Sequence, residues 1–178
     1  MSQEAEELAK AAQYYKNALK TYPRVAAPQN NLYYKMVDIY DKLEQKDKAL
    51  DTLRLHALHN NKSFDGFVKY AERLVKHGEE IKAIEAFMNA NYIFPFDSKV
   101  HNSCGSLMLK NSQLDGALRE FRVAVEIEPR DKEALVGLVE CYIKLEKSEE
   151  AKTYFDRLKR FHGEEDFSEL EKKLSEGK

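Results

Sequence analysis

The 178-residue sequence contains no tryptophan, only four prolines and seven glycines, and only two cysteines. Two cysteines do not indicate a disulfide framework, so we expect Cys104 and Cys141 to be buried, inert thiols. No run of 18 apolar residues is present, and the amino terminus is acidic rather than signal-like. The sequence shows neither a membrane-spanning helix nor a signal, so we expect this segment to be soluble and cytoplasmic.

Charge of one sign is also lacking. The formal net charge is −2 and the isoelectric point is near 6.2, although 34% of the residues are charged. A balanced surface of this kind offers no general attraction to nucleic acid or to an anionic membrane. We therefore expect neither as a partner.

Motifs of catalysis and of metal binding are missing as well. The sequence has no His-Glu-x-x-His pair, no glycine-rich phosphate loop, and no Ser or Cys nucleophile with a matched base. His56 and His59 lie three residues apart, but two ligands without a third are usually incidental. We expect no catalytic residue, no cofactor and no metal, and a chain that is not an enzyme by itself.

What the sequence does contain is a period of 34 residues. An alanine recurs at this spacing four times, as Ala49, Ala83, Ala117 and Ala151. Four residues after each alanine stands a large apolar residue: Leu53, Phe87, Phe121 and Phe155. Self-similarity at this period predicts stacked helical hairpins, with small residues where two helices approach and large ones filling the gaps between hairpins.

This pattern resembles the tetratricopeptide repeat (TPR) family. The resemblance is closest in residues 98–131 and weaker in residues 30–63, where His56 replaces the usual late alanine and Asn61 replaces a proline. The position of the family's tryptophan is filled by Tyr33, Phe67, His101 and Leu135. The resemblance implies an all-α fold, a right-handed superhelical α-solenoid of antiparallel helix hairpins.

The repeat boundaries predict one domain over residues 1–178. Its parts are a half-repeat at 1–23, full repeats at 30–63, 64–97, 98–131 and 132–165, and a capping helix at 166–175. We expect first helices at about 31–43, 65–77, 99–111 and 133–145, second helices at about 46–59, 80–93, 114–127 and 148–161, and an opening helix at about 3–21. A slightly longer loop containing Pro28 follows the half-repeat. The apolar opening helix favours a chain cut from a longer protein over a natural cap.

The resemblance implies that the first helices line a concave groove, in which a peptide or a partner helix binds. By the family pattern, the residues of this groove are Tyr34, Lys35, Asp38, Val68, Lys69, Glu72, Val75, Asn102, Ser106, Leu109, Val136, Glu140 and Ile143. Asp38, Glu72 and Glu140 occupy equivalent positions and form an acidic spine. Val75, Leu109 and Ile143 form an apolar row that could receive a partner's side chains. Small residues, Ser103 and Gly137, are expected to leave room for a close approach.

These residues predict a non-catalytic adaptor for a protein or peptide partner that is basic or hydrophobic rather than acidic. The family's carboxylate clamp for acidic chaperone tails is disfavoured, because only Lys99 fits it. Two alternatives stay open. Residues 94–101 resemble TPR tails of some bacterial metallopeptidases, so the chain could be the accessory tail of a larger enzyme. It could also self-associate through the tyrosine-rich amino-terminal end, which contains Tyr14, Tyr15, Tyr22, Tyr33 and Tyr34.

Overall fold

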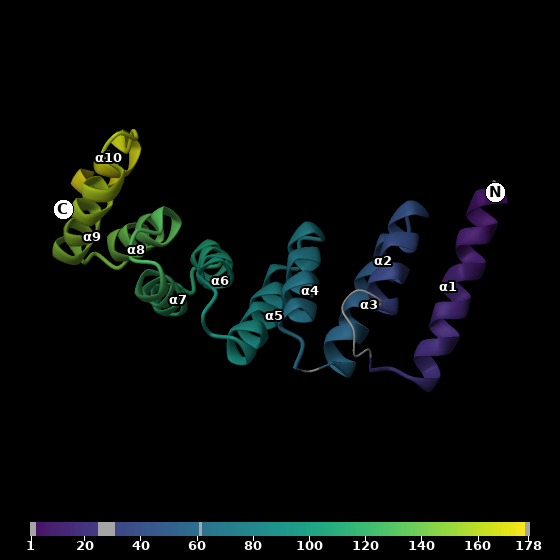
Figure 1. Ribbon diagram of the computed structural model, residues 1–178. Helices are drawn as coiled ribbons and strands as arrows, with labels where there is room; N and C mark the ends of the chain where they lie inside the picture. The colour runs from purple at the N-terminus through teal and green to yellow at the C-terminus, as the bar shows by residue number, and fades with distance from the viewer. Residues whose placement is uncertain (1–2, 25–30, 61, 177–178) are drawn as a thin grey trace. The chain divides into compact units, whose positions relative to one another are not determined.

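The computed structural model describes residues 3–24, 31–60 and 62–176 (Figure 1). It divides into two compact units, Met1–Ile93 and Phe94–Lys178, and each is described by itself. All regular secondary structure in the described ranges is α-helical. The expected loop through Pro28 and the proline position of Asn61 lie outside the described residues, and a single domain over the whole chain stays a prediction.

The first unit contains an opening helix and two hairpins. Its helices are α1 (Gln3–Thr21), α2 (Leu32–Lys42), α3 (Lys46–His59), α4 (Phe64–Lys76) and α5 (Glu80–Ile93). Helix α1 packs on α2, which forms a hairpin with α3, and α3 packs on α4, which forms a hairpin with α5. The half-repeat therefore contributes one wall to this unit.

The second unit contains two hairpins and a closing helix. Its helices are α6 (Ser98–Lys110), α7 (Leu114–Ile127), α8 (Lys132–Lys144), α9 (Ser148–His162) and α10 (Ser168–Glu176). Helix α7 packs on α8, and α10 contacts both α8 and α9. The helix positions expected from the repeat are confirmed in both units to within two residues.

The first helix of every hairpin begins with a capping side chain. Asn31, Ser63, Asp97 and Asp131 each accept a hydrogen bond from a backbone N–H two or three residues later. Such a cap satisfies a donor that the first helical turn leaves unpaired, and its loss usually destabilises a helix by about 1 kcal/mol.

The two helices of every hairpin are joined by a turn with one residue at positive φ. These residues again lie 34 apart: Glu44, Gly78, Ser112 and Glu146. The following N–H bonds back to a carbonyl near the end of the first helix, as in Gln113 N to Met108 O at 2.8 Å. This is the Schellman ending of a helix. Only one of the four residues is glycine, so tertiary packing rather than local preference fixes the turn.

A glycine compensates for the unusual histidine in the core of the first unit. His56 is 2% exposed, and the rings of Tyr33 and Tyr34 lie 5.0 Å from its own. Asn31 Nδ2 donates to His56 Nε2 at 2.9 Å. A Cβ on Gly66 would lie 2.6 Å from His56 Nδ1, so only glycine fits opposite this ring.

The core of the second unit is built around Phe121, which is 1% exposed. Its ring lies between two glycines, Gly105 of α6 and Gly137 of α8, at distances that leave no space for a Cβ on Gly137. Cys104 and Cys141 are fully buried thiols, as expected. Burial raises the pKa of each thiol to about 12, which keeps both in the unreactive protonated form.

The pair of His56 and Gly66 generates a prediction. Gly66→Ala alone should destabilise the chain by about 1–3 kcal/mol, because the new methyl group meets a locked ring. In the His56→Ala background the same change should cost less, because only the Ser63 hydroxyl, 2.9 Å from the new Cβ, remains in its way and alanine favours the helix. Urea denaturation of the four proteins measures this coupling. Equal effects of Gly66→Ala in both backgrounds would contradict the contact.

His56 also predicts a pH dependence. Burial lowers its pKa below the usual 6.5, and Nδ1 is buried without a partner among the described residues. The unfolded chain therefore binds this proton more readily, so stability is full above about pH 6.5 and falls as the pH drops through that value. The Tm of the wild type should decrease more than that of His56→Ala between about pH 7.5 and pH 5.5. Parallel curves would show that His56 titrates normally in the fold.

Candidate functional site

The predicted groove residues of the first unit are tied together by Asp65. The Tyr34 hydroxyl donates to Asp65 Oδ2 at 2.5 Å, and Lys69 Nζ lies 3.6 Å from Asp65 Oδ1. The same ammonium lies 5.4 Å from the centre of the Tyr34 ring. Burial and the neighbouring Asp65 carboxylate raise the pKa of the Tyr34 hydroxyl, which stays protonated. Tyr34 and Lys69 thus form a fixed polar contact between α2 and α4.

A second contact joins the same two helices. Arg73 of α4 forms a bidentate salt bridge with Asp41 of α2, from Nη1 to Oδ1 at 2.8 Å and from Nη2 to Oδ2 at 2.6 Å. A paired geometry of this kind orients both side chains. The other predicted residues of these helices lie on the same surface: Lys35, Asp38, Glu72 and Val75 are exposed, and Val68 is half-buried. The two carboxylates expected to begin the acidic spine are therefore accessible.

The second unit has a hollow of about 600 Å³ between α6 and α8. Four predicted groove residues line it: Ser106, Leu109, Val136 and Glu140. Phe121 contributes to its base, and Lys110, Lys132, Glu133 and Lys144 add charge around it. The structure thus brings four of the expected residues together around one partly apolar depression.

Two predicted residues of this unit lie outside the hollow. Asn102 is 3% exposed, which differs from the expected groove position. Its Nδ2 donates to Asp131 Oδ2 at 2.7 Å, so the side chain holds the start of α8. Ile143 is half-buried and lines none of the hollow.

Gly137 serves the core as well as the groove. It lines the hollow between α6 and α8, as expected of a small residue in the groove. It is also buried, and the Phe121 ring takes the space that a Cβ on Gly137 would need. Ser103, at the equivalent position of the preceding repeat, is exposed.

In the second unit, a lysine is paired with the carboxylate predicted for the acidic spine. Glu140 accepts a hydrogen bond from Lys173 of α10 at 3.3 Å. A further hollow of about 400 Å³ between α8 and α10 shares Val136 and Glu140 with the first. The closing helix therefore supplies a counter-charge that no repeat position could have predicted.

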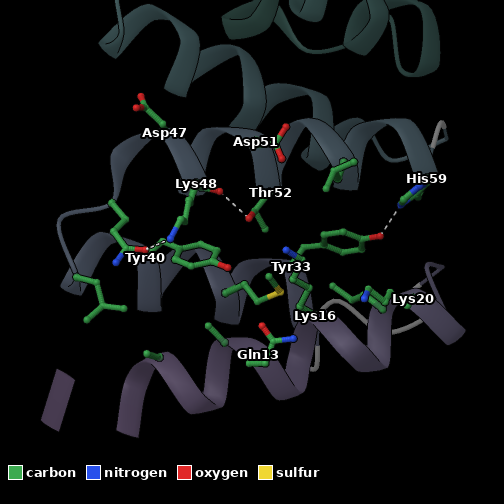
Figure 2. Close-up of a pocket in the computed structure, with 17 residues that line it drawn as sticks. Gln13, Lys16, Lys20, Tyr33, Tyr40, Asp47, Lys48, Asp51, Thr52 and His59 are labelled. Carbon is green, nitrogen blue, oxygen red and sulfur yellow. Dashed lines mark hydrogen bonds between the residues drawn. The ribbon is translucent and has the colours of Figure 1, made fainter. Parts of the chain in front are cut away.

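The first unit contains a cleft that the repeat pattern did not reveal. It has a volume of about 550 Å³ and is lined by α1, α2 and α3 (Figure 2). Tyr33, Met36 and Tyr40 contribute to its lining from α2. One signal was available in the sequence. Ala12 of α1 stands where the next three second helices carry Leu50, Ile84 and Leu118.

The tyrosine-rich end is less exposed than expected. Tyr33 is 2% exposed, and its hydroxyl donates to Pro23 O at 2.8 Å and lies 2.7 Å from His59 Nδ1. Tyr15 and Tyr34 are half-buried. Only Tyr14 and Tyr22, each about three-quarters exposed, present an aromatic surface.

The described histidines are not grouped as metal ligands. Within the described residues, no three His, Cys, Asp or Glu side chains are placed to hold a metal ion together. His101 instead lies against Glu120, with Nδ1 at 2.8 Å from Oε2, and against Pro95 O. None of the described helices is long and apolar enough to span a membrane.

A family model matches part of the chain. Residues 108–174 match a tetratricopeptide repeat model. Together with the helix order and the 34-residue period, this match supports a tetratricopeptide repeat (TPR) protein. No curated protein matches this TPR chain in sequence.

Solved TPR structures share this fold at low sequence identity. MamA matches with a TM-score of 0.66 and 17% identity, over 89% of this chain and 91% of MamA. YrrB, described as a TPR protein with an unusual peptide-binding site, matches with a TM-score of 0.66 and 21% identity, over 90% and 80%. A TPR protein from Parabacteroides merdae matches with 0.65 and 17%, over 98% and 67%. These similarities show an all-α solenoid fold.

The TPR fold indicates a protein-interaction module. TPR proteins bind protein or peptide partners.

The position of Gly137 yields a prediction on this TPR chain. Gly137→Ala should destabilise it by about 1–3 kcal/mol, because the methyl group would enter the Phe121 ring. Helix propensity alone would give the opposite sign. Ser103→Ala, at the equivalent exposed position, is the matched control and should change the free energy of unfolding by less than about 0.5 kcal/mol. A stabilised Gly137→Ala variant would refute the packing described for Phe121.

Proposed function

We propose that this TPR chain is a non-catalytic adaptor that binds a segment of a partner protein on the inward surfaces of its first helices. The observation that carries the proposal is the hollow of about 600 Å³ between α6 and α8. Its volume lies within the range of ligand sites in proteins, and a few polar groups surround its apolar base.

The second unit supports recognition of an apolar side chain. Leu109 and Val136 are half-buried, so part of each side chain is accessible to a partner, and Phe121 forms the base of the hollow with them. Removing such surface from water yields roughly 25 cal/mol per Å². A leucine- or phenylalanine-sized side chain of the partner fits this environment. The charged residues around it would contact polar parts of the same segment.

The first unit supports recognition of positive charge. Asp38 of α2 and Glu72 of α4 are exposed on the helices that Arg73 and Asp41 hold together. Two carboxylates on adjacent helices favour a cationic segment and oppose an acidic one. We therefore expect a partner segment with basic and apolar residues, in keeping with the charge of Asp38 and Glu72 and the lining of the hollow.

Selection of random peptides displayed on phage against the full chain tests this proposal. Peptides that are enriched should contain basic and apolar residues, and their affinities are then measured by fluorescence anisotropy. Leu109→Ala with Val136→Ala should weaken them by about tenfold, which corresponds to about 1.4 kcal/mol. Asp38→Lys with Glu72→Lys should weaken basic peptides at low salt, with a smaller effect at high salt.

Met88→Ala is the matched control, because Met88 is 48% exposed on α5 and lines neither hollow. Circular dichroism establishes that every variant keeps its helicity. If the selected peptides bind the groove variants and the wild type equally, the inward surfaces are not the binding site.

A further inference from the structure

The cleft of the first unit lies on a different face from the proposed groove. Its walls are α1 and α3, which are the second helices of two successive repeats, and α2 contributes its floor (Figure 2). Of the predicted groove residues, none lines it. A ligand held here would therefore be a second ligand, independent of the groove.

Small side chains on α1 open this cleft. Ala9 and Ala12 line it, and Ala12 is 4% exposed at the edge of the core. The equivalent residues of the next three second helices are Leu50, Ile84 and Leu118. Two of these, Ile84 and Leu118, are buried. Because Ala12 is smaller than these equivalent residues, it leaves the space between α1 and α3 unfilled.

The base of the cleft is apolar and well supported. Leu19, Tyr33 and Met36 form a buried cluster, and Tyr40 and Leu55 pack against it. All five also line the cleft. A base this firmly packed is preformed, so a ligand would not have to open the core to reach it.

The two walls carry opposite charge. Lys16 and Lys20, one helical turn apart, are exposed on α1 and reach from it towards the other two helices (Figure 2). Asp47 and Asp51, also one turn apart, stand on α3. Arg54 donates two hydrogen bonds to Asp51, and both go to the same carboxylate oxygen, Oδ1.

A further lysine lies on the α3 side. Lys48 is turned towards the Gln45 side chain, with Nζ to Oε1 at 2.9 Å, and lies 5.9 Å from the centre of the Tyr40 ring. Lys48 is the cation among the three charged residues of α3 that line the cleft, so the lining from α3 keeps a net negative charge.

The dimensions of the cleft select the form of the ligand. From Ala9 to Lys20 the α1 wall runs for about 17 Å, at a rise of about 1.5 Å per residue. That length spans about three turns of a helix. A ligand whose backbone lies along the cleft would therefore insert one row of side chains into its volume of about 550 Å³.

A helix suits this position better than an extended strand. The walls are helices whose backbone groups bond within the helix, so they offer no partners to an extended backbone. A helix satisfies its own backbone groups, whereas a strand would gain no backbone hydrogen bonds from these walls. The one-turn spacing of Lys16 and Lys20, and of Asp47 and Asp51, also matches the spacing of charges along a helix edge.

We infer that the cleft between α1 and α3 binds an amphipathic helix of a partner protein, with one edge acidic and the other basic. Its apolar row enters the cleft, its carboxylates face Lys16 and Lys20, and its cations face Asp47 and Asp51. This site adds a second partner contact to the chain and does not depend on the proposed groove.

Three fluorescein-labelled helical peptides of about 15 residues test the inference, all with the same leucine row. One has glutamates along one edge and lysines along the other, one has glutamates on both edges, and one has lysines on both. The mixed peptide should bind the full chain at least tenfold more tightly than either of the others in fluorescence anisotropy. The mixed peptide can match the walls in one of its two orientations, because turning the helix end to end exchanges the edges that face α1 and α3.

Ala12→Leu introduces the residue type of Leu50 and Leu118, which stand at the equivalent position, and should weaken the mixed peptide at least tenfold. Ala18→Leu is the matched control, since Ala18 is exposed on α1 and does not line the cleft. It should change the affinity less than twofold. Circular dichroism of both variants shows that the helices persist.

Lys16→Glu with Lys20→Glu gives a second, purely exposed variant in case Ala12→Leu fails to fold. It makes both walls acidic, so preference should move from the mixed peptide to the peptide with two lysine edges. Equal affinity of all three peptides for the wild type would overturn the inference.

Other occupants of the cleft would also overturn it. A wild type that is dimeric by sedimentation and becomes monomeric as Ala12→Leu would assign the cleft to a second copy. Anilinonaphthalene sulfonate fluorescence that is lost in Ala12→Leu, without binding of any peptide, would assign it to a small apolar ligand.

Discussion

The two helices of each hairpin approach at an alanine, and the arrangement of both units depends on this close contact. Ala49, Ala83, Ala117 and Ala151 are all fully buried. No side chain beyond a methyl group separates the helices there, and the large residue one turn later packs in the core, as Phe121 does between α6 and α8. The capping side chains and the turns at positive φ, which recur with the same period, then fix where each helix begins and ends.

Departures from the repeat pattern are matched by changes elsewhere in space. His56 takes an alanine position, and Gly66, ten residues later, makes room for its ring. Gly137 makes room for Phe121 in the same way. At Ala12 the side chain is smaller than its equivalents and nothing in the described residues fills the difference, so a cleft results. Where a second residue compensates for an unusual side chain, the core stays filled. Where none does, as at Ala12, a cleft remains that a ligand can occupy.

The sequence predicted the helices closely and the sites only in part. Helix positions follow from local periodicity and capping, which recur in every repeat. The ends of each helix were therefore predicted to within two residues. The surroundings of single residues depend on long-range packing, which periodicity does not encode. The sequence therefore could not show that Asn102 bonds to Asp131, or that Lys173 of the closing helix reaches Glu140. The cleft beside α1 was missed because it arises from the absence of a side chain.

The Phe121 ring has a consequence for how the second unit unfolds. It belongs to α7 but lies against Gly105 of α6 and Gly137 of α8, so it contacts its own hairpin and the next. In a repeat protein, the contacts between neighbouring hairpins decide whether they unfold separately or together. Melting α8 would expose a large aromatic ring that also anchors α6, and this coupling makes partial unfolding costly. The two hairpins of the second unit should therefore behave as a single cooperative element.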